Sequence, residues 1–191
     1  MNGTLNVTDD TAADALLNTD GTALLIAMLL DQQVAIEWAF KGPATLRERL
    51  GHLDAATIAT LDLDQFVTVC CTKPAIHRYP AVMGKRIHAL CVALDDTYDG
   101  QGANLWSDVT TGKELKRRLI ALPGYGPEKT KIFTAILAKR FGVMPDGWQA
   151  VAGPFADDQP RSVADMGSAE MRQAVREWKS VQKAAGKSKQ D

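Results

Sequence analysis

The chain has 191 residues, of which 46% are hydrophobic, and a formal net charge of −1. This composition suits a globular domain with a sizeable core, and the net charge alone indicates neither a membrane nor a nucleic-acid partner. The acidic N-terminus lacks the basic residues of a secretory signal, and the longest apolar run is too short to span a bilayer. Three cysteines without a CxxC spacing fit reduced, buried thiols, so we expect a cytoplasmic protein.

We expect residues 1–20 to be a loose polar lead-in and residues 21–185 to form a single domain. An apolar helix is predicted over residues 23–40, interrupted by the polar Asp31-Gln32-Gln33 and ended by Gly42-Pro43. Further elements then follow in order: short helices at 44–50, 54–60 and 62–71, a loop at 72–80, and a helix at 81–94.

The second half of the chain is also predicted to be helical. A Gly-rich loop at 95–106 is followed by helices at 111–122, 127–141 and 168–183, with Gly142 ending the second of these and a flexible basic tail at 186–191. Residues 145–160 are predicted to be irregular, with at most a short helix near 148–152. No run of alternating β-branched residues predicts a sheet. The predicted fold class is therefore all-α.

The sequence Ala-Leu-Pro-Gly-Tyr-Gly-Pro at residues 121–127 forms a very short connection between two of these helices. Gly124 and Gly126 permit positive φ, and Pro127 suits the first position of a helix. The amides at such a helix N-terminus attract an anion. Residues 113–140 carry eight cations against two acids, which favours a phosphate-binding surface. The alternative is an ordinary turn between two helices with a solvated basic face.

Three stretches together resemble the helix-hairpin-helix superfamily of base excision DNA repair glycosylases, in particular a small actinobacterial branch. LPGYGPEKT at residues 122–130 is similar to its hairpin signature LPGxGxxTA. LLIAMLLDQQ at 24–33 is similar to its buried helix ending in a Ser-Gln-Gln-type motif, and KPAIHRYPAVMGKRIHAL at 73–90 to the loop and helix that follow. The resemblance covers about two thirds of the chain, in the right order, and implies a compact two-lobed helical fold.

The resemblance also implies a mode of action. Such proteins bind DNA phosphates with hairpin amides, often with Na⁺ or K⁺ on hairpin carbonyls, here those near Leu122 and Gly124. They flip a nucleotide into a cleft between the lobes, where an aspartate assists cleavage of the N-glycosidic bond. No other cofactor is expected, and no iron–sulfur cluster, because no cysteine follows Cys91.

Two aspartates are candidates for the catalytic acid. Asp146 follows Gly124 at the spacing of the superfamily's aspartate, although the usual sequence around it is missing. Asp165 is the second candidate. Lyase-type members carry a Schiff-base lysine at the position of Glu128, whereas the lysine here is Lys129. Since one step along a helix rotates a side chain by about 100°, we expect a monofunctional enzyme.

The remaining site residues fall into two groups. The first is expected to contact DNA and comprises Gln33, Gly124, Tyr125, Gly126, Lys129, Thr130 and Lys131. The second is expected to line the base pocket and comprises Trp38, Tyr79 and Trp148, each of which is also a candidate core residue.

These observations predict a monomeric DNA glycosylase that acts on double-stranded DNA in a bacterial cytoplasm, on the nucleoid. A non-catalytic module that binds damaged or branched DNA is the main alternative, and it needs no acid facing the hairpin. A helical protein-interaction module is a third possibility, and it predicts no DNA binding.

Overall fold

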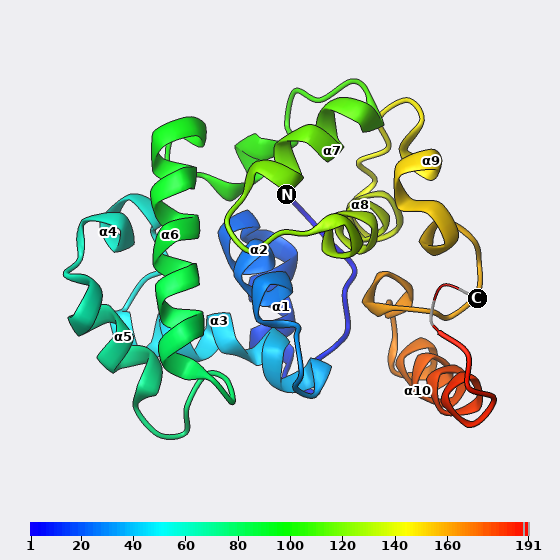
Figure 1. Cartoon of the computed structure of the whole chain (residues 1–191), viewed down its shortest axis with the longest axis horizontal. Helices are drawn as coiled ribbons and strands as arrows, with labels where there is room; N and C mark the ends of the chain where they lie inside the picture. Colours follow the sequence, from blue (N-terminus) through cyan, green and yellow to red (C-terminus); the bar gives the residue numbers. More distant parts are fainter. Residues whose placement is uncertain (189, 191) are drawn as a thin grey trace.

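The computed structural model describes residues 1–188 and 190, and this part of the chain contains helices and no strand, which confirms the all-α prediction (Figure 1). The α-helices are α1 (Thr11–Thr19), α2 (Gly21–Leu30), α3 (Ile36–Leu50), α4 (Ala55–Thr60), α5 (Leu63–Cys71), α6 (Pro80–Tyr98), α7 (Gly112–Ala121), α8 (Pro127–Phe141), α9 (Trp148–Ala152) and α10 (Ala169–Ala184). Short 3-10 helices occupy Gly102–Leu105, Gly153–Ala156 and Val163–Asp165.

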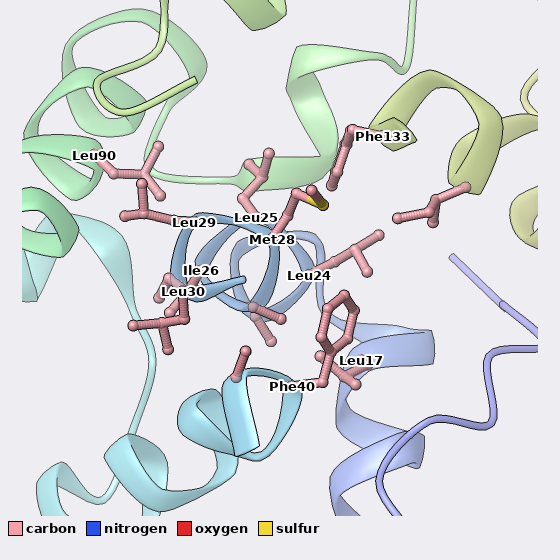
Figure 2. Packing of buried hydrophobic residues seen from close by; sticks show 14 of the residues in the cluster. Leu17, Leu24, Leu25, Ile26, Met28, Leu29, Leu30, Phe40, Leu90 and Phe133 are labelled. Carbon is pink, nitrogen blue, oxygen red and sulfur yellow. The ribbon is translucent and has the colours of Figure 1, made fainter. Parts of the chain in front are cut away.

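Helix α2 is the centre of the fold, and every one of its residues is buried. Its side chains spread in all directions, with Leu29 toward Leu90 of α6 and Met28 toward Phe133 of α8 (Figure 2). Each buried aliphatic side chain of this kind contributes about 1.5–3 kcal/mol of transfer free energy. Helices α4, α5 and α6 lie on one side of α2, and α7 to α10 lie on the other (Figure 1).

The single helix predicted over residues 23–40 is wrong, because α2 ends at Leu30 and α3 begins at Ile36. Between them Gln33 adopts a left-handed conformation with φ of 57°, which an α-helix does not allow. The prediction that Gly42-Pro43 ends a helix is also wrong, since α3 continues to Leu50. Proline removes only one helical hydrogen bond, and Gly42 lets α3 pack closely on Leu30, whose Cδ1 lies 2.3 Å from where a Cβ would be.

The prediction of a loose lead-in at residues 1–20 is wrong. Asp10 caps α1 by accepting hydrogen bonds from the amides of Ala12 and Ala13. Leu5, Val7, Ala13, Leu16 and Leu17 are buried in the core. The prediction failed because it relied on the polar composition of the segment, although the segment contains a capped helix with one apolar face.

The separate helix predicted at 44–50 is the second half of α3, and the loop predicted at 95–106 is partly wrong, because α6 continues to Tyr98 and a 3-10 helix occupies Gly102–Leu105. The other helices follow their predictions to within one residue at each end. The side chains of Asp54 and Ser168 cap α4 and α10, and Gly142 ends α8 with a φ of 69°. The tail predicted at 186–191 falls partly on Lys189 and Asp191, which lie outside the described residues, while Gln190 contacts Glu128 and Lys131 of α8. Within the described residues no helix alone is long and apolar enough to cross a membrane; only α1 and α2 together reach that length, across a 114° bend.

Candidate nucleic-acid interface

Residues 122–126 form the tight connection between α7 and α8, which we call the α7–α8 turn. Gly124 has a φ of +80°, and Gly126 precedes Pro127, the first residue of α8. The first amide bonded within α8 is that of Thr130, which donates to the Gly126 carbonyl at 3.0 Å. Nothing lies within 4 Å of where a Gly126 Cβ would be, so the backbone at the start of α8 is open to a ligand.

The α7–α8 turn rests on the last turns of α2. The Tyr125 hydroxyl donates to the Leu25 carbonyl at 2.8 Å, and its ring packs edge-on against Phe133. Burial raises the pKa of Tyr125 well above its usual value, so the hydroxyl stays protonated. A Cβ on Gly124 would lie 2.3 Å from Leu29 Cδ1. The Tyr125 side chain therefore anchors the turn to α2, and the close approach of Leu29 leaves no room for a side chain at position 124.

Two residues predicted to contact DNA have buried side chains. Tyr125 is 5% exposed and Thr130 is 1% exposed. Both side chains belong to the packed interior beneath the turn, so a contact of Tyr125 or Thr130 with DNA would be made by the backbone, and the prediction that these residues contact DNA stays untested.

Lys129, which we predicted to contact DNA, has its ammonium group bound to the end of α2, and the predicted DNA contact stays untested. Its ammonium group donates to the carbonyls of Met28, Leu29 and Asp31, the last two at 2.9 and 3.2 Å. These carbonyls lie at the C-terminal end of α2, where a cation stabilises a helix. Lys129 thus fastens the start of α8 to the end of α2. Lys131 donates to Gln190 Oε1 at 3.2 Å.

The loop at residues 31–35, directly after α2, lies beside the α7–α8 turn. Its Gln32 carbonyl meets Nε2 of His77 at 3.0 Å, and Nδ1 of His77 accepts the Tyr79 amide at 3.0 Å. This pattern requires the neutral ring with its proton on Nε2, and burial lowers the pKa of His77, which favours that form. Arg86 of α6 donates to Gln32 Oε1 at 3.1 Å. The loop is thereby fixed to the segment before α6.

Gln33 projects from this fixed loop. Its side chain is exposed, and its positive φ is uncommon for a residue other than glycine. A conformation of this kind persists only where the surroundings impose it, and it is a reason to suspect function. The prediction that Gln33 contacts DNA is untested, and its placement beside the α7–α8 turn agrees with it.

Two of the three predicted base-pocket aromatics share this surface. Trp38 and Tyr79 are 42% and 43% exposed and flank the buried His77, with ring centroids 6.3 and 6.0 Å from it. The Trp38 indole N–H donates to the Ala75 carbonyl at 3.1 Å. Trp148 lies elsewhere, where its backbone packs on Gly112 at the start of α7. The three aromatics therefore cannot line one pocket.

The segment that fixes Gln32 also carries four exposed cations that were not singled out from the sequence, and Arg86 is the one that lies next to the α7–α8 turn. Residues 73–86 carry Lys73, Arg78, Lys85 and Arg86 and contain no acid. Arg78 lies over the Tyr79 ring, 5.4 Å from its centroid, and the aliphatic part of Arg86 lies close to Gly124. The signal was present in the sequence as an acid-free basic stretch. We call the α7–α8 turn, residues 31–35 and residues 73–86 together the turn face.

The eight cations at residues 113–140, by contrast, do not form a basic patch around the turn. Arg117 and Arg118 share Glu114 in ion pairs of 2.7 and 2.9 Å, and Arg118 also pairs with Asp108. Lys139 pairs with Asp165 at 2.6 Å. At least three of the eight cations are thus paired with acids, and the eight are spread along both helices.

Asp146 lies at the far end of α7 and α8 from the turn. Its backbone bridges to Thr111, the N-cap of α7, with the Gly112 amide donating to its carbonyl at 2.8 Å. The 15 residues of α8 span about 22 Å, whereas the five Cα–Cα steps from Phe141 to Asp146 reach at most about 18 Å. The chain therefore cannot return to the turn by residue 146. The exposed Asp146 lines a cavity of about 660 Å³ together with Trp106 and Phe141.

Asp165 has a structural role. Its carboxylate accepts the amides of Arg161 and Ser162 at 3.0 and 2.9 Å, and its other oxygen pairs with Lys139. Together with Ser162 it forms a capping box around a short 3-10 helix. The structure brings neither aspartate to the turn face.

Metal sites give no further support for a function. Among residues 1–188 and 190, no group of three His, Cys, Asp or Glu side chains could hold a metal ion. The monovalent cation expected on the carbonyls of Leu122 and Gly124 stays a prediction; the Leu122 carbonyl accepts the Tyr125 amide at 3.1 Å.

Comparisons with known proteins identify no relative. No family model matches the chain, and no curated protein or solved structure matches it significantly. Function therefore has to be argued from the turn face itself.

Proposed function

We propose that this protein is a helix-hairpin-helix DNA glycosylase that binds double-stranded DNA through the turn face and hydrolyses the N-glycosidic bond of a damaged nucleotide. One observation carries the proposal: the open α7–α8 turn, the projecting Gln33 and the acid-free basic segment at 73–86 lie side by side, although they are far apart in sequence. The turn can bind a phosphate, the cations can neutralise neighbouring phosphates, and Gln33 can reach the bases.

The parts of the turn face would share the work as follows. Backbone amides at Gly124 and Gly126 would hold a phosphate at the start of α8. Lys73, Arg78, Lys85 and Arg86 would neutralise neighbouring phosphates, and Gln33 would enter the duplex. Tyr79 and Trp38 offer exposed rings on which an extruded base can stack. The protein would act as a monomer on the bacterial nucleoid.

The contacts of Lys129 support a monofunctional enzyme. A lyase needs a neutral amine that attacks the sugar, but this ammonium is held by the α2 carbonyls. The residue at the position of the superfamily's lysine is Glu128. We therefore expect base release that leaves the DNA strand intact until it is cleaved by hot alkali.

A non-catalytic module that binds damaged or branched DNA is a second candidate function. The placement of Asp146 and Asp165 away from the turn face favours it, because a glycosylase needs a carboxylate near the sugar. This candidate predicts the same DNA binding with no base release.

The first test is duplex binding as a function of salt, combined with base release from duplexes carrying alkylated, deaminated and oxidised bases. We expect the logarithm of the affinity to fall linearly with the logarithm of the salt concentration, and hot-alkali breaks to appear with one class of lesion. Binding without release from any duplex would favour the non-catalytic module. Absence of binding at low salt would refute both candidates.

A further inference from the structure

Asp31 is an acid in a position that does not favour an acid. It is the C-cap residue of α2, at the negative end of that helix dipole, where a carboxylate is destabilising. Its side chain is only partly exposed, and no described residue donates a hydrogen bond or ion pair to its carboxylate. Lys129 bonds the backbone carbonyl of Asp31. The stability of α2 therefore does not explain this residue.

Asp31 is also the one carboxylate on the turn face that has no partner among the described residues. The α7–α8 turn and residues 73–86 contain no acid. Glu37 at the start of α3 pairs with Arg176 at 2.6 Å, and Glu128 contacts Gln190 at 2.9 Å. A surface that binds phosphates gains nothing from a negative charge, so its presence requires another reason.

The position of Asp31 relative to the turn is fixed by its neighbours. Lys129, in the first turn of α8, reaches its carbonyl at 3.2 Å. The next residue, Gln32, is held by His77 and Arg86. The Asp31 backbone thus lies within the reach of one lysine side chain from the first turn of α8, close enough for Asp31 to lie beside the sugar of a nucleotide whose phosphate is bound there. In the Ser-Gln-Gln-type motif that residues 31–33 resemble, the first residue is uncharged, whereas here it is an acid.

We propose that Asp31 supplies the catalytic carboxylate of this protein, in place of an aspartate after α8. This inference rests on the proposed glycosylase function. When the bond between C1′ and the base nitrogen breaks, its electron pair leaves with the base and the sugar becomes cationic. The Asp31 carboxylate stabilises that cation and accepts a proton from the attacking water, whose oxygen bonds C1′. The proton then passes to the released base.

The test uses transition-state charge, because it does not require the lesion to be known. Two duplexes are compared, one with a neutral tetrahydrofuran abasic site and one with a cationic pyrrolidine in the same position. We expect the wild-type protein to prefer the cationic duplex by about tenfold or more, since a carboxylate next to the sugar attracts that charge. The Asp31→Asn variant should bind both duplexes equally.

Asp146→Asn is the matched control, because it removes one negative charge from the far end of α8 and should keep the preference. The melting temperature of Asp31→Asn should equal or exceed that of the wild type, since the substitution relieves repulsion with the α2 dipole. This would separate a lost function from a lost fold.

The outcomes distinguish the inference from the function on which it rests. A cation preference that survives in Asp31→Asn overturns the role of Asp31 and leaves the glycosylase proposal intact. Equal wild-type binding to both duplexes also overturns it, while DNA binding through the turn face stands. If the wild type binds neither duplex at low salt, the proposed function itself fails.

Discussion

Cations lie at both ends of the α7–α8 pair, but the two ends differ in whether these cations have acid partners. At the far end, cations and acids are paired with each other: Lys139 with Asp165 and Arg161 with Asp157. At the turn face, the cations at residues 73–86 have no acid in their own segment, and exposed rings lie among them. Cations that are paired with acids are less available to a ligand, whereas unpaired cations on a rigid surface are available to a polyanion.

This difference shows that charge counted along a sequence is a poor guide to charge on a surface. Residues 113–140 carry the larger excess of cations. However, Arg117 and Arg118 pair with nearby acids, and Lys139 pairs with Asp165 of the C-terminal segment. Residues 73–86 carry fewer cations and keep them exposed. If this difference matters, substitutions at the two ends should differ in their effects on stability and on DNA affinity.

The largest effect is expected at the far end, for Lys139→Met. Removing this lysine leaves the Asp165 carboxylate, whose side chain is 9% exposed, without its cation. An uncompensated buried charge of this kind costs about 3 kcal/mol or more of the free energy of unfolding. Lys129→Met at the turn face should cost less, about 1–2 kcal/mol, because it uncaps neutral carbonyls. Urea denaturation of both variants measures the two losses, and equal losses would contradict the comparison.

The second effect is on DNA affinity and uses two variants of equal charge. Arg78→Ala with Lys85→Ala should weaken duplex binding about 10- to 100-fold and lower the salt slope by about 2, because two phosphate contacts are lost. Lys113→Ala with Lys116→Ala, on exposed positions of α7, should change affinity by less than about threefold. Fluorescence anisotropy at several salt concentrations measures both. Equal losses would indicate that net charge alone, and not the turn face, binds DNA.

The sequence predicted the elements whose signals are local. The end of α8 at Gly142 depends on a few neighbouring residues and was placed correctly, and the helices predicted from residues 54 and 168 begin at the N-cap residues of α4 and α10. The break at residues 31–35 was not, because apolar residues lie on both sides of it and the loop is held through Gln32 by distant residues, His77 and Arg86.

The site was less predictable than the fold, for a physical reason. The spacing of Asp146 from Gly124 agrees with the superfamily, but spacing fixes position only if the helix between them has the right length. Here α8 continues to Phe141, which places Asp146 beside Thr111. The burial of the Tyr125 and Thr130 side chains could not be predicted either. A residue in a turn or in the first turn of a helix can face the core or the solvent.

A smaller effect is expected from pH between about 6 and 7, and it should arise from His77 at the turn face. Burial lowers the pKa of His77 below its ordinary value of 6.5, so the unfolded chain binds this proton more readily than the folded protein. Its contribution to stability is therefore complete above about pH 7 and is lost as the pH falls below 6.5. His77→Gln should flatten this part of the profile of melting temperature against pH. The far end, at residues 106–113 and 142–153, has no histidine to add a similar slope.

The smallest effect is expected for Asp146→Asn. Asp146 takes part in the fold through its backbone, with its amide donating to the Thr110 carbonyl at 2.9 Å, and an asparagine keeps that bond. Its exposed side chain has no hydrogen bond to a described residue, so stability should change by less than about 0.5 kcal/mol. Base release and DNA affinity should equal those of the wild type. A hundredfold loss of release with unchanged affinity would instead place the chemistry at the far end, in the cavity of about 660 Å³, and would reverse the roles of the two ends.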